Sequence, residues 1–380
     1  MIFLAIRVEA QENSRYIAQE IKYNQFTPGE IWYDTDGNPI NAHAGGILFH
    51  EGKYYWFGQI MVPGNGGSDA WVGVSCYSST DLYNWKNLGV VLSVEDDPSH
   101  PLTRGCKIER PKVIYNASTG KFIMWWHHDI KGQGHRNAMT GIAVSEGVEG
   151  PYEFIRVFRP LAEFLPSNIP ESLKDKQPDP LVYTFPFTGG SVPNHPDSLL
   201  IFKRDLHQGQ MARDMTLFVD EDGAAYHIYS SEENSTLHIA ELSEDYLGYT
   251  GKYIRIFPGR FMEAPALFKR GSQYYFIGSG CTGWAPNAAR SAVASSIWGP
   301  WEELGNPCTG ADAELTFYSQ STFILPVADT TDAFIFMADR WHPENPVEGR
   351  YVWLPVQFEG KKVALKWHDS WDLNHFKPIR

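Results

Sequence analysis

Hydrophobic and polar positions along this chain follow a hairpin pattern that occurs five times. Each copy has a polar or charged residue at the mouth of a first strand, a turn with Gly, Asp or Asn, and a second strand rich in apolar and aromatic residues. Two such runs joined by a turn of this kind predict a β-hairpin. The copies begin at Ala44, Glu109, Arg213, Glu263 and Ser319.

A second pair of strands is predicted after each hairpin, where an alternating strand leads through a turn to an outer strand. Four strands per unit, repeated along the chain, are typical of the blade of a β-propeller. The chain is therefore predicted to be all-β, a five-bladed β-propeller with four antiparallel strands per blade. The second pairs begin at Trp71, Thr140, Leu237, Ala289 and Tyr351.

The repeats favour one closed domain over residues 31–380, preceded by a lead-in over residues 1–30. A segment with eight prolines, from Phe158 to Ala212, interrupts the spacing. Because proline breaks regular structure, residues of about 159–211 are predicted to be a long insertion between blades two and three. Two interpretations of it stay open, an irregular surface loop and a wall of the central pocket.

Composition narrows the range of partners. The formal charge of −13 argues against nucleic acid or an anionic membrane surface, which both require basic patches. Aromatic residues make up 14% of the chain, including 13 Trp, and aromatic faces suit the stacking of sugar rings. The four cysteines show no metal-binding spacing, and a bridge between Cys281 and Cys308 is left open.

The N-terminus carries a short apolar run that ends in Val8-Glu9-Ala10, which resembles the tail of a secretory signal. No run of about 18 apolar residues is present, so no membrane-spanning helix is predicted. We therefore expect a secreted or periplasmic protein that does not insert into a membrane.

Polar residues that open the five first strands are expected to meet near the axis, because the innermost strands of a propeller line its channel. Charges that face a narrow channel raise one another's pKa values, which can keep one carboxyl group protonated as a general acid. A pair of carboxylates in a pocket lined with Trp and Tyr is the set of residues that a glycosidase uses. The converging residues are His43, Glu109, Asp214, Glu263 and Gln320.

Purely structural roles are alternatives to several of these catalytic and binding assignments. Glu109 and Asp214 could simply pair with Arg110 and Arg213, and a single Trp on a strand, such as Trp126, is more often core than sugar platform. His127-His128-Asp129 looks like a metal cluster, but adjacent strand residues point to opposite faces. No metal is assigned, and an ion in the central channel is left open.

Several motifs together resemble glycoside hydrolase family 43, in its exo-β-1,3-galactanase branch. They cover nearly the whole chain from about Ile31, and they are specific as a set although each is weak alone. The resemblance implies a five-bladed propeller and hydrolysis with inversion. The motifs are DTDGNPINAHAGGILF with KYYWFG, CKIERPKVIYN, ARDMTLFVDEDGAAYHIYSS, EAPALF, SGCTGWAPN and YSQST.

Matched to the family motifs, Glu263 of EAPA is implied to be the general acid and Glu109 of IERPK the residue that tunes its pKa. Most of the wider family has an Asp base in the first blade, but INAHAGG contains no acid, an absence that the exo-β-1,3-galactanase branch shares. In that branch a Gln in the last blade is thought to take its place, and Gln320 of YSQST matches it. Whether Gln320 acts as an unusual tautomer or holds the water is left open.

The resemblance also implies that Asp214, Thr282 and Trp126 grip the terminal galactose. Trp284 and His43 are further candidates for substrate binding. One departure concerns Gln59, where the branch usually has a Glu, so a hydrogen bond to a sugar hydroxyl and the preferred sugar or linkage are in question.

The sequence therefore predicts an inverting exo-glycosidase that acts without a cofactor, as a monomer. It would release galactose from the non-reducing end of β-1,3-galactan, the backbone of arabinogalactan. Two alternatives stay open. One is another family 43 exo-glycosidase, such as an arabinofuranosidase or a different galactosidase, and the other is a galactan-binding propeller without catalysis.

Overall fold

The five predicted hairpins are all antiparallel strand pairs in the computed structural model, which describes residues 22–67, 70–184, 192 and 194–377. The apolar N-terminal run predicted as a signal remnant lies outside these residues. The hairpins are β1 (His43–His50) with β2 (Lys53–Met61), β5 (Lys107–Asn116) with β6 (Lys121–Asp129), β9 (Met215–Val219) with β10 (Ala225–Ser231), β13 (Met262–Arg270) with β14 (Gln273–Gly280), and β18 (Gln320–Pro326) with β19 (Phe334–Arg340).

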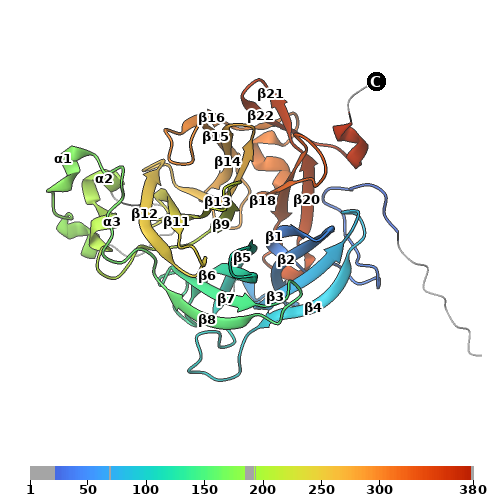
Figure 1. Ribbon diagram of the computed structural model, residues 1–380, viewed down its shortest axis with the longest axis horizontal. Helices are drawn as coiled ribbons and strands as arrows, with labels where there is room; N and C mark the ends of the chain where they lie inside the picture. The colour runs from blue at the N-terminus through green and yellow to red at the C-terminus, as the bar shows by residue number, and fades with distance from the viewer. Residues whose placement is uncertain (1–21, 68–69, 185–191, 193, 378–380) are drawn as a thin grey trace, which may run out of the picture.

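Four of the hairpins are extended by an outer pair into four-stranded antiparallel sheets, as predicted. The sheets surround a common centre, with the first strand of each hairpin innermost (Figure 1). The outer pairs are β3 (Trp71–Ser79) with β4 (Lys86–Ser93), β7 (Met139–Ser145) with β8 (Glu153–Phe158), β11 (Thr236–Leu242) with β12 (Tyr249–Ile256), and β15 (Arg290–Ala294) with β16 (Glu302–Gly305).

The predicted number of five blades is wrong, because the described strands form six sheets, four with four strands and two with three. The last predicted unit divides. Strand β20 (Arg350–Pro355) completes a sheet with β18 and β19, whereas β21 (Gln357–Glu359) and β22 (Lys362–Lys366) form a separate sheet with β17 (Cys308–Thr309). The division follows Pro355, which has no backbone N–H to extend the ladder. Counted by sheets, the propeller has six blades.

Apolar side chains fill the spaces between successive sheets, and one such cluster closes the ring. It packs Ile47 and Trp56 of the first sheet against Ile335 and Trp353 of the sheet β18–β19–β20. Phe26 joins this cluster by pairing with Trp371 near the other end of the chain. Burial of these aromatic rings, at roughly 25 cal/mol per Å², fixes the strand mouths around the axis.

In its described residues, the insertion between β8 and β9 contains short helices and no strand, and it lies at the rim beside β12 (Figure 1). Leu173, Leu200 and Phe202 form a small core of its own. Its helices are α1 (Glu171–Lys174), η2 (Pro180–Tyr183), α2 (Pro196–Leu199) and α3 (Ile201–Arg204). Further short helices elsewhere in the described chain are η3 (Ala313–Tyr318), η4 (Pro346–Glu348) and η5 (Leu373–Phe376). Within the described ranges, no helix has the length and apolar character needed to span a membrane.

Candidate active site

A bulge recurs at the central end of three innermost strands. The pairing register shifts after His43 in β1, after Glu109 in β5 and after Glu263 in β13. In each strand the following residue, Ala44, Arg110 or Ala264, has a left-handed backbone, with φ of 50°, 53° and 54°. Bulges re-aim side chains at the ends of strands. The same bulge therefore redirects the side chains at the central ends of all three strands.

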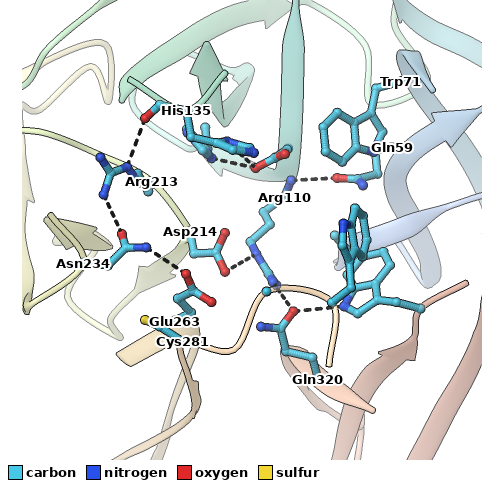
Figure 2. A pocket seen from close by; sticks show the side chains of 16 residues that line it. Gln59, Trp71, Arg110, His135, Arg213, Asp214, Asn234, Glu263, Cys281 and Gln320 are labelled. Atoms are coloured by element: carbon cyan, nitrogen blue, oxygen red, sulfur yellow. Dashed lines mark hydrogen bonds and ion pairs between the residues drawn. The ribbon is translucent and has the colours of Figure 1, made fainter. Parts of the chain in front are cut away.

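A cavity of about 470 Å³ lies at these strand mouths (Figure 2). This volume is in the range of small-molecule sites in proteins. The residues that line the cavity come from positions 44 to 341 of the chain, so residues distant in sequence meet in one place. The predicted residues that line it are Gln59, Glu109, Asp214, Glu263, Trp284 and Gln320.

Arg110 is the centre of the hydrogen-bond network in the cavity (Figure 2). Its Nε lies 2.9 Å from Oδ2 of Asp214, and one terminal nitrogen donates to Oε1 of Gln320 at 2.7 Å. The other terminal nitrogen donates to the carbonyl of Ser321, and the backbone N–H of Arg110 donates to Oε1 of Gln59. One arginine therefore fixes three of the predicted site residues.

Two carboxyl groups in the cavity are held in opposite protonation states. Burial, together with the negative charge of Asp214, raises the pKa of Glu263 to about 8. Burial also opposes the ionisation of Asp214, but the charge and hydrogen bond of Arg110, the charge of His127 and the backbone N–H of Ala264 together outweigh it and lower the pKa of Asp214. Near neutral pH, Glu263 is therefore an acid that can donate a proton, while Asp214 is a carboxylate.

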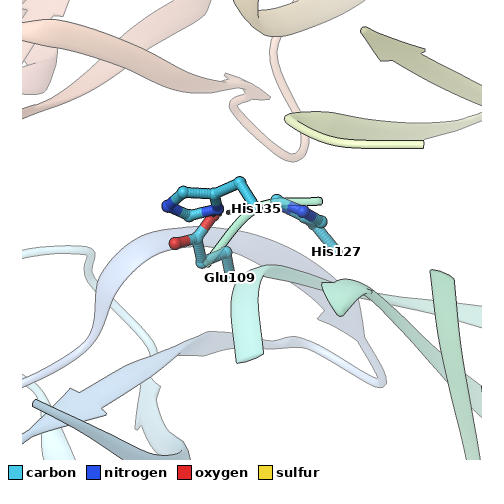
Figure 3. A group of neighbouring side chains, drawn as sticks. All are labelled: Glu109, His127 and His135. Atoms are coloured by element: carbon cyan, nitrogen blue, oxygen red, sulfur yellow. Dashed lines mark ion pairs between the residues drawn. The ribbon is translucent and has the colours of Figure 1, made fainter. Parts of the chain in front are cut away.

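Glu109 is held by His127 (Figure 3). Nδ1 of His127 lies 2.8 Å from Oε2 of Glu109, and its Nε2 lies 2.7 Å from Oδ2 of the buried Asp129. Burial disfavours the charged imidazole, but the charges of Glu109 and Asp129 and the hydrogen bonds to both carboxylates together outweigh it and raise the pKa of His127 to about 10. Burial likewise opposes ionisation of Glu109, yet the charges of His135 and His127 lower its pKa. Glu109 is therefore a fixed carboxylate.

Glu109, His127 and His135 also have the donor atoms of a metal site, since one ligand atom from each lies within 4.8 Å of the others. Both ring nitrogens of His127 already face carboxylates, so a metal would have to displace a proton from between them. His128 points away, as the alternation of strand residues predicts, and accepts a hydrogen bond from Trp126.

Backbone oxygens near the axis accept hydrogen bonds from a lysine side chain. Nζ of the buried Lys112 donates to the backbone oxygen of Ala44 at 2.9 Å and to that of Arg110 at 3.4 Å. Burial lowers the pKa of Lys112 well below its usual value. Carbonyl oxygens of the kind that would bind a cation in the channel are thus already bonded to a side chain.

Three predicted binding residues do not line the cavity. Trp126 is fully buried in the core between the first two sheets, because the opposite face of β6 carries His127 into the cavity. His43 is also fully buried, stacked on Tyr351 and bonded to Asp339. Thr282 donates to the carbonyl of Ala285 and so shapes its own loop.

Sequence reasoning did not find several cavity residues. Trp71 and Trp341 stand at strand ends, and Trp341 meets Trp284 edge to face at 5.6 Å while its Nε1 donates to Oε1 of Gln320 at 2.9 Å. Asn234 comes from the turn between β10 and β11. Cys281 lines the cavity as a free thiol, as all four cysteines are free, so no bridge to Cys308 is formed. A strand-end position was the available signal for the two tryptophans.

Comparison with known proteins agrees with this geometry. Residues 197–354 match the sequence model of glycosyl hydrolases family 43. A β-D-galactofuranosidase from Aspergillus niger is 30% identical over 136 residues, which is 35% of this chain and 38% of that protein. The chain thus spans well under half the length of that curated relative.

Solved structures extend the match along the chain. A family 43 β-1,3-galactosidase in complex with galactodeoxynojirimycin is 52% identical, with a TM-score of 0.85, and the match covers 92% of this chain and 100% of that one. An exo-β-1,3-galactanase from Clostridium thermocellum is 35% identical, with a TM-score of 0.72, over 91% of this chain and 66% of that one. An exo-β-1,3-galactanase from Phanerochaete chrysosporium, solved with β-1,3-galactotriose, is 30% identical, with a TM-score of 0.72, over 92% of this chain and 69% of that one.

The resemblance drawn from the motifs is confirmed by these matches, which include structures of the exo-β-1,3-galactanase branch. One relative at 52% identity is covered along its whole length. The chain therefore belongs to glycosyl hydrolase family 43 and is a glycoside hydrolase.

Proposed function

We propose that this protein is an exo-acting, inverting hydrolase that releases galactose from the non-reducing end of β-1,3-galactan, the backbone of arabinogalactan. The main support is a single cavity in which Glu263, with a pKa raised to about 8, lies beside ionised Asp214 and near Arg110 and Gln320. The sugar and linkage are proposed from the similar β-1,3-galactosidase and exo-β-1,3-galactanases. A location outside the cytoplasm belongs to the proposal, because a polymeric galactan does not cross a membrane.

In the proposed reaction, Glu263 gives its proton to the glycosidic oxygen as the bond from that oxygen to the anomeric carbon breaks. A water molecule attacks the anomeric carbon from the opposite side and releases its proton to solvent, from which Glu263 is protonated again, so the sugar leaves with inverted configuration. Glu109 keeps a fixed negative charge in the cavity, which opposes loss of the proton from Glu263 until the leaving oxygen takes it.

Gln320 is proposed to hold the attacking water as a neutral amide. Its Oε1 accepts from Arg110 at 2.7 Å and from Trp341 at 2.9 Å, and both partners can only donate. The imidic acid tautomer would place a hydrogen on that same oxygen. The network therefore favours the amide form, which donates one Nε2 hydrogen to Ser279 and has the other for a water molecule.

Gln59 presents hydrogen-bond donors to the sugar. Its Oε1 accepts from the backbone of Arg110 at 3.1 Å, and its Nε2 bonds to no described side chain. A Glu at this position would present an acceptor instead. We propose that Gln59 selects a sugar oxygen that accepts, which is the consequence of its departure from the usual residue of the branch.

The cavity continues toward solvent in a way that suits a polymeric leaving group. A second hollow of about 200 Å³ shares Trp284, Gln320 and Trp341 with it and extends to Tyr318 and Arg340. Trp284 and Tyr318 are both exposed there, with 36% and 46% of their surface accessible. Aromatic faces at this exit can stack the sugars that follow the scissile bond.

Product analysis by NMR during digestion of β-1,3-galactan tests the proposal. We expect galactose as the early product, released first as the α-anomer because the β-linkage is inverted. A β-1,4-galactan, an aryl arabinofuranoside and an aryl galactofuranoside serve as controls and should react much more slowly. Binding of the galactan without turnover would instead support a non-catalytic propeller.

The pH dependence of the rate follows from the pKa of Glu263. A general acid works while it carries its proton, so kcat/KM for β-1,3-galactobiose should be maintained near neutral pH and fall as the pH rises through about 8. Initial rates across the neutral and alkaline range measure this. A decline already in the acidic range of an ordinary glutamate would contradict the assignment.

A further inference from the structure

The insertion between β8 and β9 is linked to the cavity although it lies at the rim of the propeller (Figure 1). Among its described residues within 159–211, none lines the cavity, so this part of the insertion is not the pocket wall that the sequence left open. It reaches inward through Arg204 of α3, which lies 3.1 Å from Oε1 of Glu233. Glu233 belongs to the turn between β10 and β11.

This turn has an unfavourable backbone. Glu232, Glu233 and Asn234 are consecutive left-handed residues, with φ of 50°, 60° and 64°, and all three are buried. Left-handed geometry is unfavourable for residues with a Cβ, and such backbones persist only where the surroundings hold them. The turn therefore needs external support.

Two ion-pair struts supply that support from the insertion. One is the pair between Arg204 and Glu233. In the other, Arg255 of β12 lies 2.9 Å from Asp197 of α2 and donates to Glu232 at 2.7 Å. These side chains are largely buried, so their charges are weakly screened by solvent.

This turn also holds Glu263, the proposed general acid (Figure 2). Arg213 lies 3.2 Å from Oε2 of Glu233 and donates to Oδ1 of Asn234 at 3.1 Å. Because a guanidinium only donates, this bond fixes which end of the Asn234 amide is oxygen. Nδ2 of Asn234 then donates to Oε1 of Glu263 at 2.7 Å. Oε1 is thus an acceptor, and the acidic proton of Glu263 belongs on Oε2.

We propose that Asn234 is a positioning residue that sets which oxygen of Glu263 carries the proton, and that the insertion secures this geometry through Arg204 and Glu233. The inference rests on the proposed role of Glu263 as general acid. The charged and titratable groups that act most strongly on Glu263 are Asp214, Arg110, Arg213 and Cys281, and Glu109 adds a further negative charge to the cavity, whereas Asn234 carries no charge.

The leaving group provides the test, because a dinitrophenolate departs without a proton and a sugar does not. In Asn234→Ala, kcat for β-1,3-galactobiose should fall about 10- to 100-fold, while kcat for 2,4-dinitrophenyl β-galactoside should change less than about threefold. An equal loss on both substrates, or no loss on galactobiose, would overturn the proposal.

Removal of the strut should give a weaker effect in the same direction. Arg204→Met is expected to lower kcat for galactobiose about three- to tenfold, with the dinitrophenyl substrate spared. Lys174→Met is the matched control, since Lys174 also belongs to the insertion and its described ion pair is with Glu171 on the surface. A control variant as slow as Arg204→Met would contradict a specific role for the strut.

Asn234→Asp keeps the shape of the side chain in case the alanine variant does not fold. The added negative charge beside Glu263 should move the alkaline limb of galactobiose hydrolysis up by about one pH unit. An alkaline limb at the same pH as in the wild type would contradict the contact between Asn234 and Glu263. If instead Glu263→Gln itself shows no dependence on the leaving group, the proposed function fails, which separates that outcome from failure of the present inference.

Discussion

Glu263→Gln should nearly abolish hydrolysis of β-1,3-galactobiose while leaving its binding intact. The amide has the size of the carboxyl group and can still accept from Asn234, but it has no proton of useful acidity for the leaving oxygen. General acid catalysis contributes about 10²–10⁴ in rate, so kcat should fall by that factor and KM should change little. Steady-state kinetics on the disaccharide measure both constants.

A matched control and a second substrate sharpen this expectation. Glu302→Gln removes a carboxylate from an exposed ion pair with Lys361 and should leave kcat unchanged. The loss in Glu263→Gln should shrink on 2,4-dinitrophenyl β-galactoside, because that leaving group needs no proton. A variant that keeps more than about a tenth of the activity on galactobiose would show that another group supplies the proton.

Much of the fold was readable from the sequence because a hairpin with one polar mouth residue is a local pattern. Turn residues and alternation specified the hairpins, and the ring followed from their repetition. The division of the last unit after Pro355 was not readable. Strands β21 and β22 leave the sheet of β20 because β22 pairs in parallel with β17 (Cys308–Thr309), and a strand of two residues gives too short a pattern to predict.

The site was readable only where its residues open the inner strands. Glu109, Asp214, Glu263 and Gln320 meet as the repeat predicts. Trp126 was assigned to the wrong face, because blade strands are covered on both sides and β6 is apolar on both, so hydrophobicity does not tell which side faces the cavity. Asn234 was missed because its place depends on a strained turn held by distant charges.

Arg110→Met is expected to damage both activity and stability. It removes the partner of Asp214 and one of the two donors that hold Gln320, so kcat/KM should fall about 10²–10³-fold through misplacement of both groups. Since the pair is largely buried, loss of one member leaves an uncompensated charge, and the free energy of unfolding should drop by about 3–5 kcal/mol. Arg260→Met, at an exposed pair with Glu303, is the control and should change neither quantity much.

The sign of the pH effect tests the electrostatic cause. In the wild type, burial opposes ionisation of Asp214, but Arg110 helps to lower its pKa below that of an unfolded Asp, about 3.9. The ion pair therefore stabilises the fold fully above the unfolded pKa. This stabilisation is lost as the pH falls through the lower pKa of the folded state. Without Arg110 the pKa of Asp214 should rise, so acidification should cost the variant less stability than it costs the wild type. Denaturant unfolding at neutral and acidic pH measures the difference.

Adding Asp214→Asn to Arg110→Met separates charge from catalysis. The double variant no longer buries an unpaired carboxylate, so it should regain part of the unfolding free energy that the single variant lost. Its activity should not return, because Gln320 still lacks its donor from Arg110 and Glu263 loses the negative charge that helps to keep its pKa high. Recovery of both quantities together would mean that Arg110 acts on the fold alone, and recovery of neither would mean that the loss in the single variant arises from packing.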